Sequence, residues 1–182
     1  MLPQEVTVRQ DFLPLDLYDQ VNVYSKDILW GRPDREHFTT HHWWPPETVC
    51  DSQPILIHRP TQDVPFYSRL RDIMEDTSGL EVEQIYFYYG TMYSYFPWHN
   101  DIHPKSNRNG AITIYLNEIW DHNWGGYYMF KETEFDIRAI QPKQNLMILS
   151  KGGVIHSTTP VSKSADIRRS IQVYLGRPKN AQ

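Results

Sequence analysis

The stretch that decides the fold is Arg168-Arg169-Ser170-Ile171-Gln172-Val173-Tyr174-Leu175. Successive side chains of a β-strand point to opposite faces, so this alternation separates an aliphatic face from a polar one. One face carries Arg169, Ile171, Val173 and Leu175, and the other carries Arg168, Ser170, Gln172 and Tyr174. Residues 111–117 alternate in the same way. Both stretches are therefore predicted to be strands with one aliphatic face against a core.

The polar faces of these two predicted strands leave two interpretations open. If the aliphatic faces pack beneath helices, the polar faces look into a barrel interior, where every buried polar group needs a partner. A lining of Arg, Ser, Gln, Thr and Tyr then indicates a ligand cavity. The alternative is a pair of ordinary half-exposed strands whose polar faces are in contact with water.

Working outward from these strands, most of the chain after residue 83 has the pattern of further short strands. The predicted strands are 85–89, 111–117, 126–131, 135–141, 146–150, 154–160 and 168–175. Because no helix separates them, they predict a mainly β fold, an antiparallel sandwich or barrel. Before residue 80, helical spacing of apolar residues predicts helices at 15–26 and 65–76, the second of which ends at Gly79.

Length and composition fit one water-soluble domain. The chain has 182 residues, with 18 basic and 22 acidic side chains and a net charge of −4, so no nucleic-acid-binding surface is expected. Its longest aliphatic run, 146–149, is far too short to span a membrane, and the single Cys50 fits a reducing compartment. We expect a cytoplasmic protein with one domain over 1–182, comprising a helical and irregular cap at 1–80 and a β core at 81–177.

Metal-ligand residue types occur at two places in the predicted β core. His99 and Asp101 follow a strand-like run at 93–98 and can turn to the same side at its end. His156 supplies a third ligand. Two histidines and one carboxylate, with the other coordination positions open, form the ligand set of non-heme Fe(II) oxygenases. The competing interpretation of His99 and Asp101 is a hydrogen-bonded pair in a loop.

An oxygenase that uses a keto acid also needs a cation for the distal carboxylate of that acid. Arginine suits this task because its planar guanidinium binds a carboxylate through two parallel hydrogen bonds. Arg168 lies on the polar face, with Ser170 on the same side. Arg169 points the opposite way in a regular strand, where we expect a surface charge above the aliphatic face. A β-bulge would exchange the two arginines.

Two other groups of histidines have structural interpretations. His103 precedes Pro104, which argues against a helix that would place it beside His99, so we interpret it as a loop residue. The run His41-His42-Trp43-Trp44-Pro45-Pro46 is compatible with a substrate lid and equally with aromatic cover for the core of the cap.

Five motifs together resemble the 2-oxoglutarate and Fe(II)-dependent dioxygenases, specifically their prolyl-4-hydroxylase-like branch, in both order and spacing. They are His99-x-Asp101, Tyr115-Leu116-Asn117, Trp124-Gly125-Gly126, His156-x-x-x-Pro160 and Arg168-x-Ser170-Ile171, and they cover residues 87–177. The resemblance implies a double-stranded β-helix, a cupin-like jelly roll, with N-terminal helices packed on the larger sheet. It assigns iron to His99, Asp101 and His156, and 2-oxoglutarate to Arg168, Tyr115 and Ser170.

The resemblance also implies an activity. Such an enzyme uses O2 to hydroxylate an amino-acid, peptidyl (for example prolyl) or small-metabolite substrate and releases succinate and CO2, with ascorbate as a candidate further cofactor. Asp101 favours hydroxylation over halogenation, because related halogenases have a small residue there. Two alternatives keep the same ligands: a cupin-like metal or small-molecule binding protein without oxygenase activity, and a zinc hydrolase or isomerase. Neither gives Arg168 and Tyr115 a task.

Overall fold

Strand β10 (Arg168–Pro178) lies in the middle of a seven-stranded antiparallel sheet. A computed structural model describes residues 5–30, 39–40, 52–102 and 107–179. Within this part, the large sheet has the order β1-β8-β5-β10-β4-β3-β2 and a small sheet has the order β7-β6-β9. The remaining strands are β1 (Glu5–Arg9), β2 (Thr39–Thr40), β3 (Ile55–His58), β4 (Leu80–Gly90), β5 (Gly110–Tyr115), β6 (Tyr128–Lys131), β7 (Ile137–Ile140), β8 (Met147–Lys151) and β9 (His156–Thr158).

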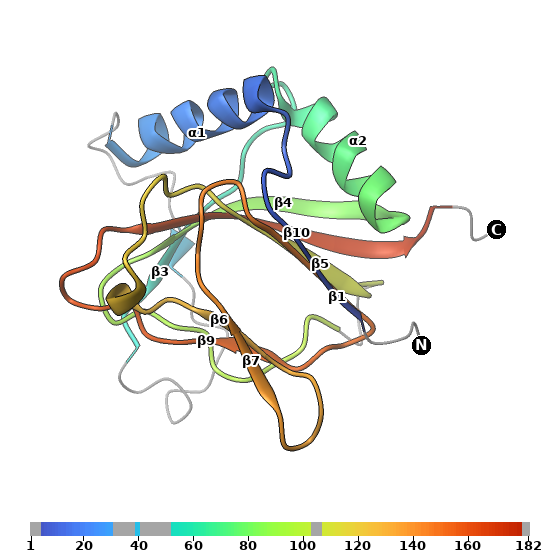
Figure 1. The fold of residues 1–182 in the computed structure, drawn as a ribbon. Helices are drawn as coiled ribbons and strands as arrows, with labels where there is room; N and C mark the ends of the chain where they lie inside the picture. The colour runs from blue at the N-terminus through green and yellow to red at the C-terminus, as the bar shows by residue number, and fades with distance from the viewer. Residues whose placement is uncertain (1–4, 31–38, 41–51, 103–106, 180–182) are drawn as a thin grey trace.

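Two helices cover one side of the large sheet, and the small sheet faces its other side. Helices α1 (Leu15–Trp30) and α2 (Tyr67–Ser78) lie across β4, β10 and β5, with β6, β7 and β9 on the opposite side (Figure 1). The protein is therefore mainly β, a jelly roll with N-terminal helices packed on the larger sheet. This confirms the predicted fold class.

The two faces of β10 have the different environments that the alternation predicts. Ile171, Val173 and Leu175 are fully buried in the main hydrophobic core with Leu17 of α1 and Leu70 of α2. The polar residues of β10 line a pocket between the sheets instead, as do Thr113 and Tyr115 of β5. The alternative of half-exposed strands with wet polar faces is thus wrong, because burial of the aliphatic faces under the helices leaves the polar faces inside the barrel, where they line this pocket.

Arg169 differs from its prediction. It is 6% exposed rather than a surface charge, and Asn117 Oδ1 accepts a hydrogen bond from its backbone N–H. Its guanidinium donates to Asn22 Oδ1 of α1 at 2.7 Å and to the Leu116 carbonyl at 3.2 Å. The alternation gave the correct face, but α1 covers this end of β10, so the charge is buried and satisfied by neutral acceptors.

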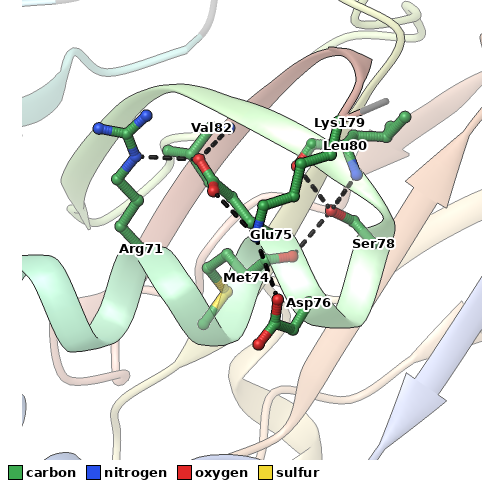
Figure 2. A network of polar contacts seen from close by, with 8 residues as sticks. All are labelled: Arg71, Met74, Glu75, Asp76, Ser78, Leu80, Val82 and Lys179. Carbon is green, nitrogen blue, oxygen red and sulfur yellow. Dashed lines mark hydrogen bonds and ion pairs between the residues drawn. The ribbon is translucent and has the colours of Figure 1, made fainter. Parts of the chain in front are cut away.

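The C-terminal end of α2 is joined to the sheet by a polar network. Gly79 ends the helix as predicted, in a left-handed conformation with φ of 70°. Glu75 Oε1 accepts hydrogen bonds from Arg71 Nε at 2.9 Å and from the Val82 backbone N–H at 3.2 Å (Figure 2). Lys179 Nζ lies 3.4 Å from Glu75 Oε2. One carboxylate therefore ties α2 to the start of β4 and to the chain after β10.

Replacing Glu75 by glutamine is expected to lower the free energy of unfolding by about 1–3 kcal/mol, because hydrogen bonds to a charged group are lost. Burial alone would raise the pKa of Glu75, but hydrogen bonds from Arg71 and Val82 outweigh it and hold the pKa below the usual 4.5. The carboxylate therefore stabilises the fold above about pH 4.5, and this contribution disappears as the pH falls through the lowered pKa. Urea unfolding should show a larger difference between wild type and Glu75→Gln at pH 7 than at pH 3.

Asp76→Asn is the matched control for this prediction, since the Asp76 side chain is 77% exposed beside the same Lys179. It is expected to change stability by less than about 0.5 kcal/mol. A difference between wild type and Glu75→Gln that is the same at both pH values would contradict the proposed contribution of the Glu75 charge.

Two parts of the fold differ from the predicted strands. The run 93–98 is not a strand: Tyr93 has a positive φ of 64°, and Pro97 has no N–H to donate to a ladder. In addition, β1, β2 and β3 precede residue 81 and pair in the large sheet. The predicted division into a cap at 1–80 and a core at 81–177 stays a prediction.

Three features of the sequence analysis lie in parts of the chain that the structure does not describe. The run from His41 to Pro46, Cys50 and His103 lie outside the described residues. Among the residues that are described, no helix has both the length and the hydropathy to cross a membrane.

Candidate active site

A pocket between the large and the small sheet collects the predicted site residues. Its lining includes all six of them together with seven others: Tyr88, Phe96, His99, Asp101, Thr113, Tyr115, Tyr128, His156, Thr158, Arg168, Ser170, Gln172 and Tyr174. The polar face of β10 forms one wall, and β6 and β9 of the small sheet form the opposite one. The fold thus brings residues from 88 to 174 into one cavity.

The two histidines are held together by their backbones. His99 N donates to the His156 carbonyl at 2.9 Å, and His156 N donates to the His99 carbonyl at 2.8 Å. This isolated antiparallel bridge joins the loop after β4 to the first residue of β9. The imidazole centroids are consequently only 4.3 Å apart.

The side-chain hydrogen bonds of both histidines fix the orientation of their rings. His99 Nδ1 lies 2.7 Å from the Pro97 carbonyl, and His156 Nδ1 lies 2.9 Å from the Val154 carbonyl. A proton on each Nδ1 satisfies these contacts and leaves a lone pair on each Nε2, as in metal-ligating histidines. Burial, together with the neighbouring His156, lowers the pKa of His99 and favours its neutral form.

Asp101 lies between the two Nε2 atoms. Its Oδ1 is 3.8 Å from His99 Nε2, and its Oδ2 is 3.4 Å from His156 Nε2. One ligand atom from each of the three residues lies within 4.8 Å of the others. The carboxylate is 8% exposed, so a charged oxygen at this place is largely removed from water. Among the described residues, this is the one group with the residue types and spacing of a metal site.

Arg168 reaches the same pocket from β10, and it is 3% exposed. Its Nη1 donates to the Gly126 carbonyl at 2.9 Å, which holds the guanidinium against the loop before β6. Burial lowers its pKa, an effect that Tyr115 partly offsets, and arginine nevertheless remains charged in proteins. The pocket therefore contains a desolvated positive charge that can bind a carboxylate.

The sequence of the β core decides the family of this protein. The profile of the 2OG-Fe(II) oxygenase superfamily matches residues 84–176, half of the chain. The chain belongs to this superfamily. No curated protein sequence matches it.

Solved structures of other 2OG-Fe(II) oxygenases and of prolyl hydroxylases share the fold of this oxygenase. A Pseudomonas putida prolyl-4-hydroxylase has a TM-score of 0.76 at 16% identity, over 96% of this chain and 94% of that one. A Trichoplax adhaerens prolyl hydroxylase, in complex with a hypoxia inducible factor peptide fragment, has a TM-score of 0.77 at 14% identity, over 97% and 87%. A Burkholderia pseudomallei oxidoreductase of the 2OG-Fe(II) family has a TM-score of 0.64 at 15% identity, over 97% and 89%.

The residues of this oxygenase fit the Fe(II) and 2-oxoglutarate that its superfamily implies. A buried polar atom without a hydrogen bond is unfavourable. Three such atoms in the described part of the chain belong to residues that line this pocket. They are Asp101 Oδ2, Arg168 Nε and the Tyr128 hydroxyl oxygen. A carboxylate beside two imidazoles suits a divalent cation, and a buried guanidinium suits an organic anion.

Tyr115 and Ser170, the two residues predicted to assist Arg168, line the same pocket as its guanidinium. Tyr115 is fully buried; burial raises its pKa while Arg168 opposes the rise, which places the phenol within the electrostatic reach of the guanidinium. Ser170 pairs with Tyr115 across β10 and β5 and lines the same wall. Both are donors, because the phenol and the hydroxyl remain protonated at neutral pH.

Several lining residues were not predicted as site residues. Gln172 and Tyr174 continue the polar face of β10, so the period of two already placed them there. Tyr88 lies in the part of β4 that is buried on both faces, where the alternation gives no signal. Tyr128 lies on β6, a strand of only four residues, and has the pattern of an ordinary buried aromatic residue. Tyr88 and Tyr174 join their hydroxyl groups at 2.9 Å, a contact between residues 86 positions apart that no local pattern reveals.

Gly126→Ala is expected to displace Arg168 and to weaken 2-oxoglutarate binding by about 10-fold. A Cβ at Gly126 would lie 3.0 Å from Arg168 Cδ and 3.3 Å from Trp120 Cζ2, and Gly126 has a φ of +66°. The affinity is measured by calorimetric titration of the Mn(II)-loaded protein. Gly79→Ala is the control, since Gly79 has a φ of +70° with nothing within 4 Å of its Cβ position. Both variants should lose stability, and equal affinities in the two would contradict the packing argument.

Proposed function

We propose that this protein is a hydroxylase that binds Fe(II) through His99, Asp101 and His156 and 2-oxoglutarate through Arg168, with Tyr115 and Ser170 as additional donors. The observation that carries the proposal is the shared pocket. Two histidines with oriented Nε2 atoms, a carboxylate with an unsatisfied oxygen and a desolvated guanidinium meet inside one barrel. A binding protein without redox chemistry has no need for this combination.

The residues of the chain have separate tasks in the proposed reaction. With Fe(II) and 2-oxoglutarate bound, the chemistry supplied at this site is oxidative decarboxylation to succinate and CO2, coupled by O2 to hydroxylation of the substrate. His99 and His156 keep their Nε2 atoms aimed at the metal position, since the Pro97 and Val154 carbonyls hold the rings. Arg168 fixes one end of the co-substrate. The aromatic rings of Tyr88, Phe96 and Tyr128 limit access of water.

We propose that the substrate is an amino acid, hydroxylated on its side chain either within a peptide or as a free small molecule. The similarity to prolyl hydroxylases, one of them solved with a bound peptide fragment, supports a peptidyl substrate such as a prolyl residue. A pocket wall of Tyr88, Phe96 and Tyr174 can pack against an apolar ring while its hydroxyl groups bind a carbonyl. Ascorbate is proposed only as an added reductant.

An anaerobic titration of the Fe(II)-loaded protein with 2-oxoglutarate tests the proposal. We expect the weak visible charge-transfer band of a chelated keto acid in the wild type, and no band in His99→Ala. Succinate release after admission of air then serves to screen peptides and amino acids, with and without ascorbate. If the folded, Fe(II)-loaded protein gives no band, the function is instead that of a cupin-like metal or small-molecule binding protein.

A further inference from the structure

Tyr128, on β6, is a pocket residue to which the proposed function gives no specific contact. The residue is 4% exposed. Its ring stacks on the His156 imidazole, with centroids 5.1 Å apart and an angle of 17° between the planes. The phenol therefore lies at the metal end of the pocket, in contact with one of the three proposed metal ligands.

The hydroxyl group of Tyr128 has no hydrogen-bond partner of good geometry among the described residues. Ser150 of β8 approaches this hydroxyl group, and a tyrosine hydroxyl carries its proton at neutral pH. A buried O–H without an acceptor is unfavourable. The group is thus a donor inside the pocket, and its natural complement is an acceptor that arrives with a ligand.

The other unsatisfied atoms of the pocket indicate which ligand supplies this acceptor. Asp101 Oδ2 is an acceptor and suits a cation, whereas Arg168 Nε is a donor and suits an anion. 2-Oxoglutarate is a dianion whose two carboxylates lie at opposite ends of the molecule. If Arg168 binds one carboxylate, the other end lies toward His99, Asp101 and His156 and still offers oxygen atoms that accept hydrogen bonds.

We infer that the Tyr128 hydroxyl donates a hydrogen bond to the keto-acid end of bound 2-oxoglutarate, while its ring supports the His156 imidazole. This inference rests on the proposed function, because it needs 2-oxoglutarate in the pocket. Tyr128 is then a third kind of contact to the co-substrate. Arg168 and Tyr115 hold the distal carboxylate, and Tyr128 determines how strongly the pocket binds the end that carries the oxo group.

Tyr128→Phe tests the inference, because it removes only the oxygen atom and keeps the stacked ring. Calorimetric titration of the Mn(II)-loaded protein with 2-oxoglutarate should give a dissociation constant about 10-fold higher than that of the wild type. Affinity for Mn(II) should be unchanged. The melting temperature of the metal-free protein should be unchanged or higher, because the variant no longer buries an unsatisfied hydroxyl. Tyr127→Phe is the control, since the Tyr127 hydroxyl donates to the His122 carbonyl on the exposed side.

The possible results separate the inference from the proposed function. If the wild type does not bind 2-oxoglutarate at all, the proposed function fails. If the wild type binds it and Tyr128→Phe binds it equally well, only the inference is overturned. The inference is also overturned if Tyr128→Phe lowers the melting temperature as much as Ser150→Ala does and the two variants lose the same affinity, because the hydroxyl would then be a structural partner of Ser150.

Discussion

Asp101→Ala is expected to abolish turnover and to weaken Fe(II) or Mn(II) binding by about 100-fold or more, without destabilising the metal-free protein. Loss of groups that merely orient metal ligands already costs about 10- to 100-fold in affinity, and Asp101 is a proposed ligand. In the absence of metal, its buried Oδ2 has no hydrogen bond from the described residues. Removing an unsatisfied buried charge should therefore leave the melting temperature unchanged or raise it. Metal titration and thermal unfolding of the metal-free protein measure the two effects.

Asp121→Ala is the control for Asp101→Ala, because we expect it to change stability and not metal affinity. Asp121 is an exposed aspartate that caps the 3-10 helix His122–Trp124 by accepting a hydrogen bond from the Asn123 backbone N–H. Its removal should cost about 1 kcal/mol of stability and leave metal affinity unchanged. If Asp101→Ala instead loses stability like a cap and still binds the metal, Asp101 is a structural residue and the proposed triad is wrong.

Arg168→Met is expected to lower the affinity for 2-oxoglutarate on the order of 100-fold, because a desolvated, charge-assisted contact with a carboxylate is lost. Methionine retains much of the aliphatic volume between Gly90 and Gly126, which both lie close to the Arg168 side chain. Affinity for Mn(II) should be retained, since Arg168 is not among the three clustered ligands. Calorimetry with Mn(II)-loaded protein gives both constants.

The adjacent Arg169 provides a matched control on the other face of the same strand. Arg169→Met removes the hydrogen bonds to Asn22 and to the Leu116 carbonyl, so it should cost about 1–3 kcal/mol of stability. Its affinity for 2-oxoglutarate should equal that of the wild type. The assignment of Arg168 as the anchor fails if both variants lose affinity equally, or if Arg169→Met loses more.

The strands that flank the pocket were predictable because one face of each packs in the hydrophobic core and the other lines a polar pocket, which leaves a strict alternation of apolar and polar residues. The alternation in β10 predicted which face packs on the core and which face carries Arg168, and the structure has no bulge at this point to exchange Arg168 and Arg169. The environment of Arg169 was not predictable in this way, because the groups that cover it come from α1, 147 residues away in sequence. Alternation tells which residues share a face, whereas what packs on that face depends on the tertiary fold.

The candidate metal ligands were recognisable from residue type and order, but the backbone contacts that hold them together were not. The paired backbone hydrogen bonds between His99 and His156 join an irregular loop to a three-residue strand, and neither has a clear periodicity. The strand predicted at 93–98 was wrong for a related reason. That segment makes scattered hydrogen bonds with the chain around β9, such as Tyr93 N to the Val161 carbonyl, without forming a regular ladder.

The position of Tyr128 in the site could not be predicted from the local sequence pattern. Strand β6 has four residues, of which Tyr128 and Phe130 face inward, and both read as ordinary core aromatics. The unsatisfied hydroxyl becomes visible only when Ser150, Asp101 and His156 are placed around it. The proposed role of Tyr128 depends on the absence of a hydrogen-bond partner for its hydroxyl group, and no local sequence pattern reveals such an absence.

The position of β10 has a consequence for how the chain acquires its fold. This strand pairs with β4 on one side and β5 on the other, although both precede it by more than fifty residues. During synthesis, β4 and β5 therefore expose unpaired edges until β10 has left the ribosome. Such distant pairings form slowly, and unpaired edges recruit other chains. Substitutions that delay β10 should thus reduce the yield of folded enzyme through aggregation, even where the finished protein is stable.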